Sequence, residues 1–597
     1  MHKLLEVPFD AVTIMEKKKS IKRELMQKDN FIELRVAILG GSTTSELKAV
    51  LELFLLEDGI KPIFYESEYN KWYEDAVFAN QELEAFNPQL IYIHTSFVNI
   101  EHLPAVSDKK ADTDANFALD TAKFAQVWKV LTTKYQAVII QNNFELPSQL
   151  QFGNQDAVKI NGYINYVNRL NQFIYDYSLN NNNFYINDIN YLSANYGLDK
   201  WHDRDFYNLY KFALAYDAIP YLAYNLGQLI KASVGKTKKC LVLDLDNTLW
   251  GGVIGDDGVN GIQLGHETAV GESFVEFQRY VAKLKERGVI LAVCSKNDLE
   301  TAKTGFTHPD SVLKVEDFAA FVINWEPKHL NLLKVVKEIN IGLDSLVFID
   351  DNPVERQIIK EQLQEVIVPD VVAGEPSSYI EALEQGRYFE QLSISDDDLK
   401  RNKTYLENKK RNDLEREFIS YDDFLRSLDM KAEIKSFIPM YLDRIAQLTN
   451  KTNQFNLTTK RYIRGEIEAI ADNKDYITLY GRLKDKFGDN GLVSVVVGRR
   501  EKEVLYIDLW LMSCRVLKRD FEFAMFNELA KIAKEQGIKE IIGYYYRTPK
   551  NNMVADLYEN FGFSKADVQG IEWKYSLTDA HQLKHVHISI NGRNYEN

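Results

Sequence analysis

Acidic residues directly follow two apolar stretches in the middle of the chain. Asp244 and Asp246 come after the run CLVL, and Asp350 and Asp351 come after SLVFI. Ser295 likewise follows the run VILAVC. Continuous apolar runs that turn polar at their C-terminal ends are typical of buried parallel strands, and ligands bind just beyond the carboxyl ends of such strands. We therefore expect these side chains to meet at one edge of a sheet.

Such a group has the composition of a metal-assisted phosphoryl-transfer site. Carboxylate oxygens are ligands for Mg²⁺, which usually keeps positions for substrate phosphate. Asp244 can attack phosphorus, and Asp246 can protonate the leaving oxygen and later activate water. Ser295 and Lys328 offer a hydroxyl and an ammonium group for the phosphoryl oxygens. Taken singly, such residues are equally typical of helix caps and turns after strands, which is the alternative interpretation.

The order DLDNT, SKN, K and DD resembles the four motifs of the haloacid dehalogenase (HAD) superfamily of phosphatases and phosphotransferases. The longer strings LDLDNTLWGGVIGDDG, VCSKND, WEPK and FIDDNPVER are similar to its FkbH-like subgroup. The resemblance implies an aspartyl-phosphate mechanism with Mg²⁺. It assigns catalysis to Asp244, Asp246 and Lys328, substrate binding to Thr248, Ser295 and Asn297, and the metal to Asp244, Asp350, Asp351 and, through its backbone carbonyl, Asp246.

The same resemblance implies a reaction. FkbH-like proteins are associated with taking a glyceryl unit from 1,3-bisphosphoglycerate, removing phosphate and passing the acyl group to an acyl carrier protein. That chemistry needs a thiolate nucleophile. Cys294 is the first candidate because it adjoins Ser295, followed by Cys514 and then Cys240; the alternative for Cys294 is burial in the sheet core. A plain phosphomonoesterase and a noncatalytic protein that docks a carrier are the competing functions.

Composition limits the partners. The net charge of −15 argues against nucleic acid as a ligand. The N-terminal sequence lacks the pattern of a secretory signal, and no apolar run is long enough to span a membrane. Three scattered cysteines favour a reducing compartment. We therefore expect a cytoplasmic protein that meets neither membrane nor nucleic acid.

Alternating strand-like and helix-like runs predict an α/β chain. Its 597 residues suggest three or four domains, and we divide them into three. Residues 1–232 form an SGNH-like or flavodoxin-like α/β domain, residues 233–392 a HAD-like parallel sheet, residues 393–419 a solvated helical linker and residues 420–597 a GNAT-like α/β domain.

The central domain is expected to lack a large cap. About fifty residues separate Asp246 from Ser295, and their glycines suit hairpin turns. A run beginning at Glu365, EVIVPDVV, is a candidate for a further strand of this sheet.

In the N-terminal domain, Gly-Gly-Ser42 after a strand and Asp199-Lys-Trp-His202 resemble pieces of SGNH hydrolases. They suggest a Ser42–Asp199–His202 triad, with only Asn142 or Asn143 as candidates for the oxyanion hole. A degenerate, structural domain is the preferred alternative.

The C-terminal domain resembles GNAT acyltransferases, which grip the pyrophosphate of acetyl-CoA with a Gly-rich turn at a helix N-terminus. Here the matching stretch is RVLKRD, residues 515–520, and Lys518 and Asp520 occupy the two positions where small residues are expected. We therefore expect a GNAT-like fold whose activity the sequence leaves open, with a docking module as one alternative. The pair Lys518 and Arg519 is a candidate contact for a phosphopantetheine arm or an acidic carrier, and solvated side chains are the alternative.

Overall fold

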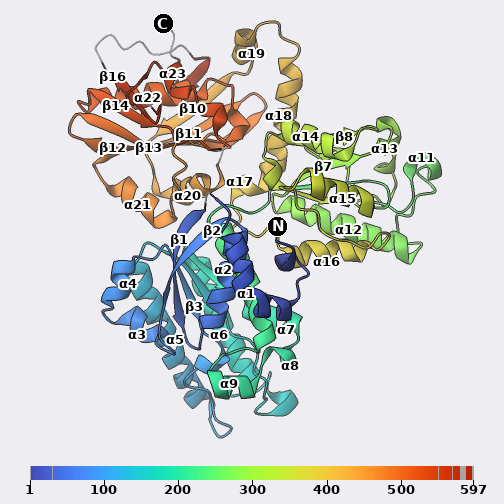
Figure 1. The fold of residues 1–597 in the computed structure, drawn as a ribbon, viewed down its shortest axis with the longest axis vertical. Helices are drawn as coiled ribbons and strands as arrows, with labels where there is room; N and C mark the ends of the chain where they lie inside the picture. Colours follow the sequence, from blue (N-terminus) through green and yellow to red (C-terminus); the bar gives the residue numbers. More distant parts are fainter. Residues whose placement is uncertain are drawn as a thin grey trace. The chain divides into compact units, whose positions relative to one another are not determined.

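The computed structural model describes residues 2–29, 31–452, 454–548, 550–567, 569–577 and 586–594. The chain divides into two compact units, Met1–Ser233 and Val234–Asn597 (Figure 1). The second unit contains two sheets; the finer division into domains stays a prediction. In the parts of the chain that the structure describes, no helix is both long enough and apolar enough to cross a membrane.

The N-terminal unit is built on a parallel sheet with the strand order β2-β1-β3-β4-β5. This is the flavodoxin-like order, in which the chain reverses direction across the sheet between β1 and β3 and leaves a crevice at their carboxyl ends. The strands are β1 (Ile32–Gly40), β2 (Ile60–Glu66), β3 (Leu90–His94), β4 (Val138–Asn142) and β5 (Phe184–Asn187).

The helices of this unit bury the apolar strands. One buried cluster joins Ala37, Ile91 and Ile139 of the strands to aromatic and aliphatic side chains of α5 and α6. The helices are α1 (Ala11–Leu25), α2 (Ser45–Glu57), α3 (Trp72–Val77), α4 (Gln81–Phe86), α5 (Lys110–Lys134), α6 (Tyr163–Asn180), α7 (Ile189–Tyr196), α8 (Leu198–Trp201), α9 (Arg204–Tyr210) and α10 (Ile219–Ser233).

The first sheet of the second unit is parallel, with the order β8-β7-β6-β9. Its strands are β6 (Cys240–Leu243), β7 (Ile290–Ser295), β8 (Ala320–Ile323) and β9 (Leu346–Ile349). Side chains alternate between two buried faces, as period two requires. One face packs on α12 (Ala269–Glu286) and α16 (Pro376–Gly386), the other on α14 (Lys328–Ile339) and α15 (Pro353–Gln362).

Two details differ from the expected central sheet. The run at 365–372 contributes one isolated parallel bridge, between Ile367 and Val347, and no extended strand. The edge beyond β7 is formed by β8, which the sequence analysis did not identify. Residues 246–295, all described, hold α11 (Ile254–Asp257), α12 and a bridge between Gly251 and Gln263. The expected absence of a large cap is confirmed.

The second sheet of this unit is mixed, with the order β15-β16-β14-β13-β12-β11-β10-β17-β18. Strands β10 to β13 run antiparallel, and α22 (Phe521–Glu535) leads from β13 to the parallel β14, a GNAT-like arrangement. Its strands are β10 (Met430–Lys435), β11 (Tyr476–Asp485), β12 (Gly488–Glu501), β13 (Val504–Met512), β14 (Glu540–Tyr544), β15 (Ser564–Lys565), β16 (Glu572–Ser576), β17 (Ile588–Ile590) and β18 (Arg593–Asn594).

The remaining helices of the second unit are α13 (Leu299–Gly305), α17 (Asp396–Leu399), α18 (Arg401–Glu415), α19 (Tyr421–Ser427), α20 (Leu442–Lys451), α21 (Arg464–Asp472) and α23 (Leu557–Asn560).

The linker is helical, as predicted, but the expectation that it is solvated is wrong. Tyr405 of α18 lies in the buried cluster of the central sheet. Arg411 is 2% exposed, and its guanidinium donates two hydrogen bonds, of 2.8 and 2.7 Å, to the carboxylate of Asp485 in β11. Asp398 is fully buried and accepts a hydrogen bond from Gln447 of α20. Helix α18 therefore packs against both sheets.

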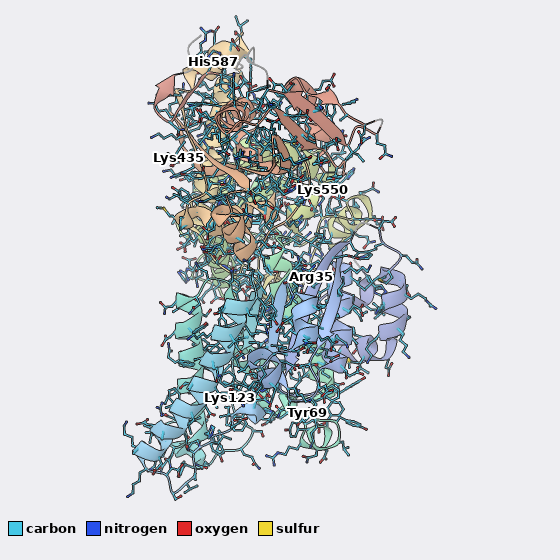
Figure 2. The ribbon with its side chains drawn as sticks, turned by 90° about the vertical axis from the view of Figure 1, so that its left-hand side faces the viewer. Arg35, Tyr69, Lys123, Lys435, Lys550 and His587 are labelled. Atoms are coloured by element: carbon cyan, nitrogen blue, oxygen red, sulfur yellow. The ribbon has the colours of Figure 1, made fainter. Side chains whose placement is uncertain are left out.

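Contacts from the linker and the C-terminal sheet reach the central sheet at the amino ends of its strands. Lys239, just before β6, donates from Nζ to the carbonyl of Lys451 at 3.1 Å. Arg401 donates to the carbonyl of Gly288, just before β7, at 2.9 Å. Lys550, labelled in Figure 2, pairs with Asp344, just before β9. The carboxyl ends of these strands make none of these contacts.

The burial of Arg411 predicts a large loss of stability on its removal. Arg411→Ala leaves the buried carboxylate of Asp485 with one ion pair, to Arg519 at 3.2 Å, and two backbone hydrogen bonds. The variant should lower the free energy of unfolding by about 3 kcal/mol. Lys410→Ala changes an exposed cation on the same helix and should have little effect. Chemical denaturation measures both; equal stabilities of the two variants would contradict a role for the buried pair.

Candidate active site

The predicted site residues gather at the carboxyl edge of the central sheet. Asp244 follows the last residue of β6, Ser295 ends β7, and Asp350 follows the last residue of β9. The amide of Asp244 donates to the carbonyl of Ile349 at 3.0 Å, which keeps the two strand ends side by side. Lys328 arrives from the far side of β7 as the first residue of α14, after Pro327.

Lys328 bridges two of the acids. Its Nζ lies 2.6 Å from Oδ2 of Asp244 and 2.5 Å from Oδ2 of Asp350. Lys328 is 4% exposed and Asp350 is 0% exposed, so these ion pairs are shielded from water. One buried ammonium group therefore fixes the carboxylates of two strands that are neighbours in the sheet.

Three carboxylates converge in a way that suits a hard cation. Oxygen atoms of Asp244, Asp350 and Asp351 lie within 4.8 Å of one another. Arg356 of α15 holds the backbone behind them by donating to the carbonyls of Asp350 and Asp351 at 2.8 and 2.7 Å. An all-oxygen, negatively charged donor set of this kind fits Mg²⁺. Asp246, expected to join the metal ligands through its backbone carbonyl, contributes no carboxylate to this group.

Burial and mutual repulsion set the protonation of these groups. Burial, with the charge of Asp244 added, raises the pKa of Asp350 to about 7, against the opposing effect of Lys328. The pKa of Asp351 is raised by the same two causes. Burial alone would lower the pKa of Lys328, but the ion pairs with Asp244 and Asp350 raise it. Lys328 therefore stays charged, and a second cation would relieve the remaining excess of negative charge.

Asp246 is clamped by three donors that the sequence did not reveal. Its Oδ1 accepts from the indole of Trp250 at 2.9 Å and from the amide of Ile254 at 3.0 Å. Its Oδ2 accepts from the side-chain amide of Asn297 at 2.9 Å. Burial nevertheless raises the pKa of Asp246. Asn297, predicted to bind substrate, is thus placed against the predicted acid/base.

The remaining polar predictions fall at the same edge. Thr248 is fully buried, and its Oγ1 has no hydrogen-bond partner among the described residues. Ser295 is 2% exposed. A buried hydroxyl without a partner is costly unless a ligand satisfies it, which fits the predicted contact of Thr248 with a phosphoryl group.

The structure argues against Cys294 as an acyl-carrying thiol. Its side chain is fully buried among apolar residues on the α14 face, together with Cys240. Burial raises the pKa of both thiols far above their usual range, so the reactive thiolate is disfavoured. Adjacent strand residues point to opposite faces, so Ser295 does not share this orientation. The side chain of Cys514 lies outside the described residues.

The N-terminal unit does not assemble the suggested triad. Ser42 is buried and its Oγ has no hydrogen-bond partner in the described part of the chain, whereas His202 lies 3.2 Å from the carbonyl oxygen of Leu146. Asp199 is exposed at the start of α8.

The candidate oxyanion-hole amides are engaged elsewhere. Asn142 donates to the carbonyl of Thr95 at 3.1 Å, and Asn143 donates to Asp188 at 2.7 Å. A structural domain remains the preferred interpretation.

The turn before α22 has the backbone conformation that glycine favours, although non-glycine residues occupy it. Lys518 and Asp520 have φ of 61° and 57°, in the left-handed region that favours glycine. Arg519 is buried and donates to Asn408 of the linker helix at 2.9 Å. The hydroxyl of Tyr421 donates to the carbonyl of Lys518. Arg519 is therefore committed to internal contacts, which does not favour the predicted contact with a carrier.

Comparisons with known proteins place the chain among phosphatase-containing relatives. The family model described as FkbH, N-terminal domain, matches residues 35–231. A crystal structure of the N-terminal part of protein BF1531 from Bacteroides fragilis, described as containing a phosphatase domain and complexed with Mg, is 33% identical. The match covers 63% of this chain and 99% of that one, with a TM-score of 0.58.

Two acetyltransferases give smaller matches. Ribosomal-protein-S18-alanine N-acetyltransferase from Escherichia coli is 12% identical over 25% of this chain and 97% of its own, with a TM-score of 0.20. The PaiA N-acetyltransferase from Thermoplasma acidophilum, in complex with coenzyme A, is 17% identical over 24% and 99%, with a TM-score of 0.19. No curated protein matches the chain.

The carboxylate group predicts metal-dependent stabilisation. Mg²⁺ should raise the melting temperature, because a ligand that binds the folded state stabilises it. Asp351→Asn removes one carboxylate from the group and should weaken the apparent Mg²⁺ affinity by about tenfold or more. Asp370→Asn, an exposed acid of the same domain, should leave the Mg²⁺ response unchanged. Thermal shift against Mg²⁺ concentration distinguishes them, and identical curves would remove Asp351 from the site.

Proposed function

This chain belongs to the FkbH-like family of the HAD superfamily, and we propose that it is a Mg²⁺-dependent enzyme that removes phosphate from a phosphorylated small molecule. The observation that carries the proposal is the contact of Lys328 with both Asp244 and Asp350, beside Asp351, at the carboxyl edge of a parallel sheet. The three carboxylates and the buried ammonium group sum to a charge of −2, which a divalent cation would balance, and the ammonium group is also a partner for phosphoryl oxygens.

Each residue would have a defined part in the reaction. Asp244 attacks phosphorus and forms an aspartyl-phosphate while the leaving oxygen departs. Asp246 gives that oxygen a proton and then takes one from the attacking water. Lys328 and the hydroxyls of Thr248 and Ser295 hold the phosphoryl oxygens. Asp244, Asp350 and Asp351, with the backbone carbonyl of Asp246, would hold Mg²⁺, which would neutralise charge on the phosphoryl oxygens.

A finer proposal concerns the substrate. We propose 1,3-bisphosphoglycerate as donor and an acyl carrier protein as acceptor of the glyceryl unit. The uncapped edge, with only α11 between Asp246 and α12, supports access by a large or carrier-bound substrate. The burial of Cys294 favours a route in which that thiol takes no part, or the alternative of a plain phosphomonoesterase. A noncatalytic docking protein would not need the bridged acids.

The proposal predicts the effect of removing the nucleophile. Asp244→Asn should reduce Mg²⁺-dependent phosphate release by at least about a thousandfold, because an amide cannot form the aspartyl-phosphate. The assay supplies 1,3-bisphosphoglycerate and a holo carrier protein and measures both phosphate and carrier mass. Phosphate without a gain in mass would leave a phosphatase. Undiminished release by the variant would exclude Asp244 as nucleophile.

The clamp on Asp246 predicts a second kinetic effect. Asn297→Ala removes the donor to Oδ2, so the acid/base loses orientation and kcat should fall about tenfold to a hundredfold, with KM nearly unchanged. Trp250→Phe removes the donor to Oδ1 and should act in the same direction. A change confined to KM would instead return Asn297 to the predicted role of contacting substrate.

Because the thiol of Cys294 is buried, we expect its removal to have little effect on activity, in contrast to the changes at Asp244 and Asn297. Cys294→Ala removes a small buried side chain on the α14 face and should leave both phosphate release and any mass gain of the carrier within about threefold of the unmodified protein. Loss of the mass gain with phosphate release retained would restore Cys294 as the acyl carrier.

A further inference from the structure

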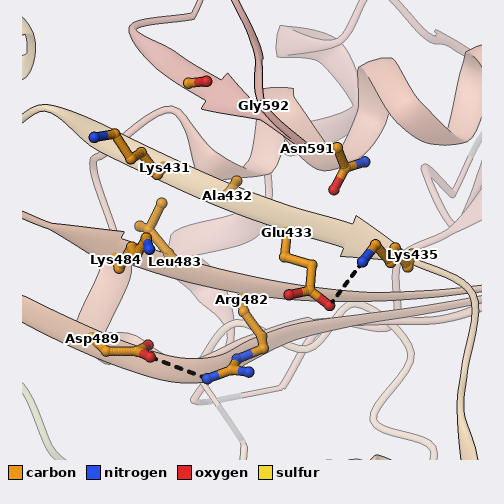
Figure 3. A pocket seen from close by; sticks show the side chains of 11 residues that line it. Lys431, Ala432, Glu433, Lys435, Arg482, Leu483, Lys484, Asp489, Asn591 and Gly592 are labelled. Atoms are coloured by element: carbon orange, nitrogen blue, oxygen red, sulfur yellow. Dashed lines mark hydrogen bonds and ion pairs between the residues drawn. The ribbon is translucent and has the colours of Figure 1, made fainter.

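The C-terminal sheet carries a hollow whose lining is positively charged, although the chain as a whole is acidic. The hollow measures about 520 Å³ and lies along β10, β11 and the segment after β17 (Figure 3). The charged side chains that line it are Lys431, Glu433, Lys435, Arg482, Lys484 and Asp489. They sum to a charge of +2, against −15 for the chain. A local excess of this sign attracts anions.

The strand register creates this charge. Met430 and Ala432 of β10 are buried in the core, so the alternate residue Lys431 projects from the opposite face. Strands β10 and β11 are antiparallel, and Lys431 lies directly opposite Lys484. Like charges in directly opposed positions destabilise a sheet. An anion bound between them would relieve this repulsion.

The acids of the hollow are already paired. Glu433 accepts a hydrogen bond from the hydroxyl of Tyr480 and lies 3.4 Å from Nζ of Lys435. Asp489 lies 3.1 Å from the guanidinium of Arg482. These acids therefore do not neutralise the two opposed lysines.

The four cations of the hollow differ in how they are held. Arg482 also donates to the hydroxyl of Tyr441 at 2.6 Å and stacks over its ring, which fixes the guanidinium in place. Lys431 pairs at 3.1 Å with Asp429, whose side chain is 71% exposed. Lys484 has no ion pair with any described residue. Lys435, labelled in Figure 2, is exposed as well. The hollow thus combines one positioned guanidinium with lysines free to turn toward a ligand.

We propose that this hollow binds a small molecule that carries phosphate. A phosphate group has several acceptor oxygens and more than one negative charge, which match two ammonium groups and a fixed guanidinium. The volume falls in the range of small-molecule sites, about 300–1,000 Å³. Ser589 and Asn591 border the hollow and add polar groups for the rest of the ligand. The hollow shares no residue with the phosphatase site, so this proposal is tested independently of the proposed phosphatase activity.

The experiment uses the full chain, free of divalent metal, with inorganic pyrophosphate as probe and citrate as an anion without phosphate. Titration calorimetry should show pyrophosphate binding that weakens with added salt, and citrate should bind at least tenfold more weakly at equal ionic strength. Hydrogen exchange should show protection in peptides covering 430–435 and 480–485. Equal binding of citrate would overturn the phosphate preference, and absence of protection there would overturn the site.

Matched variants test the opposed lysines. Lys431→Gln with Lys484→Gln should weaken pyrophosphate binding at least tenfold. Lys474→Gln with Lys502→Gln removes the same charge from exposed positions outside the hollow and should change it less than twofold. Without ligand, the first pair should also melt higher than the control pair at low salt, because the opposed charges are gone. Unchanged affinity in the first pair would refute the assignment.

Discussion

The buried ammonium group of Lys328 is the interaction on which the carboxyl edge of the central sheet depends. Three carboxylates within 4.8 Å of one another would repel strongly in a buried setting. The single charge of Lys328 pairs with two of these carboxylates, and the ammonium group reaches them because α14 begins at that residue after β8 and the following turn. The short edge strand, which contributes no acid itself, thereby delivers the counter-charge.

The same edge is organised before any ligand arrives. Arg356 fixes the carbonyls of Asp350 and Asp351, and Trp250, Ile254 and Asn297 fix the carboxylate of Asp246. Fixed dipoles need not reorganise when charge moves during a reaction, which is the main source of electrostatic stabilisation in enzymes. Buried Thr248 is the exception, with a hydroxyl that a ligand would satisfy.

Local pattern was enough to predict the features that depend on it. Apolar runs ending in Asp or Ser identified β6, β7 and β9 and their shared edge, because parallel strands place equivalent ends together. The face of Cys294 also follows from alternation: Ile290, Ala292 and Cys294 share one face, so the cysteine belongs to the core. Cys294 and Ser295 are adjacent in sequence but project to opposite faces, and the Cys294 thiol contacts the backbone carbonyl of Lys328 from the buried face.

Features that rest on distant partners could not be predicted in this way. The charged composition of residues 393–419 indicated solvation, yet Arg411 is neutralised by Asp485, which lies 74 positions further along the chain. The clamp on Asp246 depends likewise on Asn297, 51 positions away. Trp250 was the one residue of this clamp that the sequence could have indicated, because a buried indole needs a hydrogen-bond acceptor for its N–H.

The linker and the C-terminal part of the chain contact the central domain at Lys239, Gly288 and Asp344. The position of these contacts sets their distance from the acidic edge. These residues precede the central strands, whereas Asp244 and Asp350 follow them, so the length of the strands, about 13 Å for the four residues of β6, separates the two ends. The acidic edge and the points where the C-terminal sheet is attached therefore lie at opposite ends of the same strands. The attachment leaves the carboxyl edge, where the acids lie, clear of these contacts.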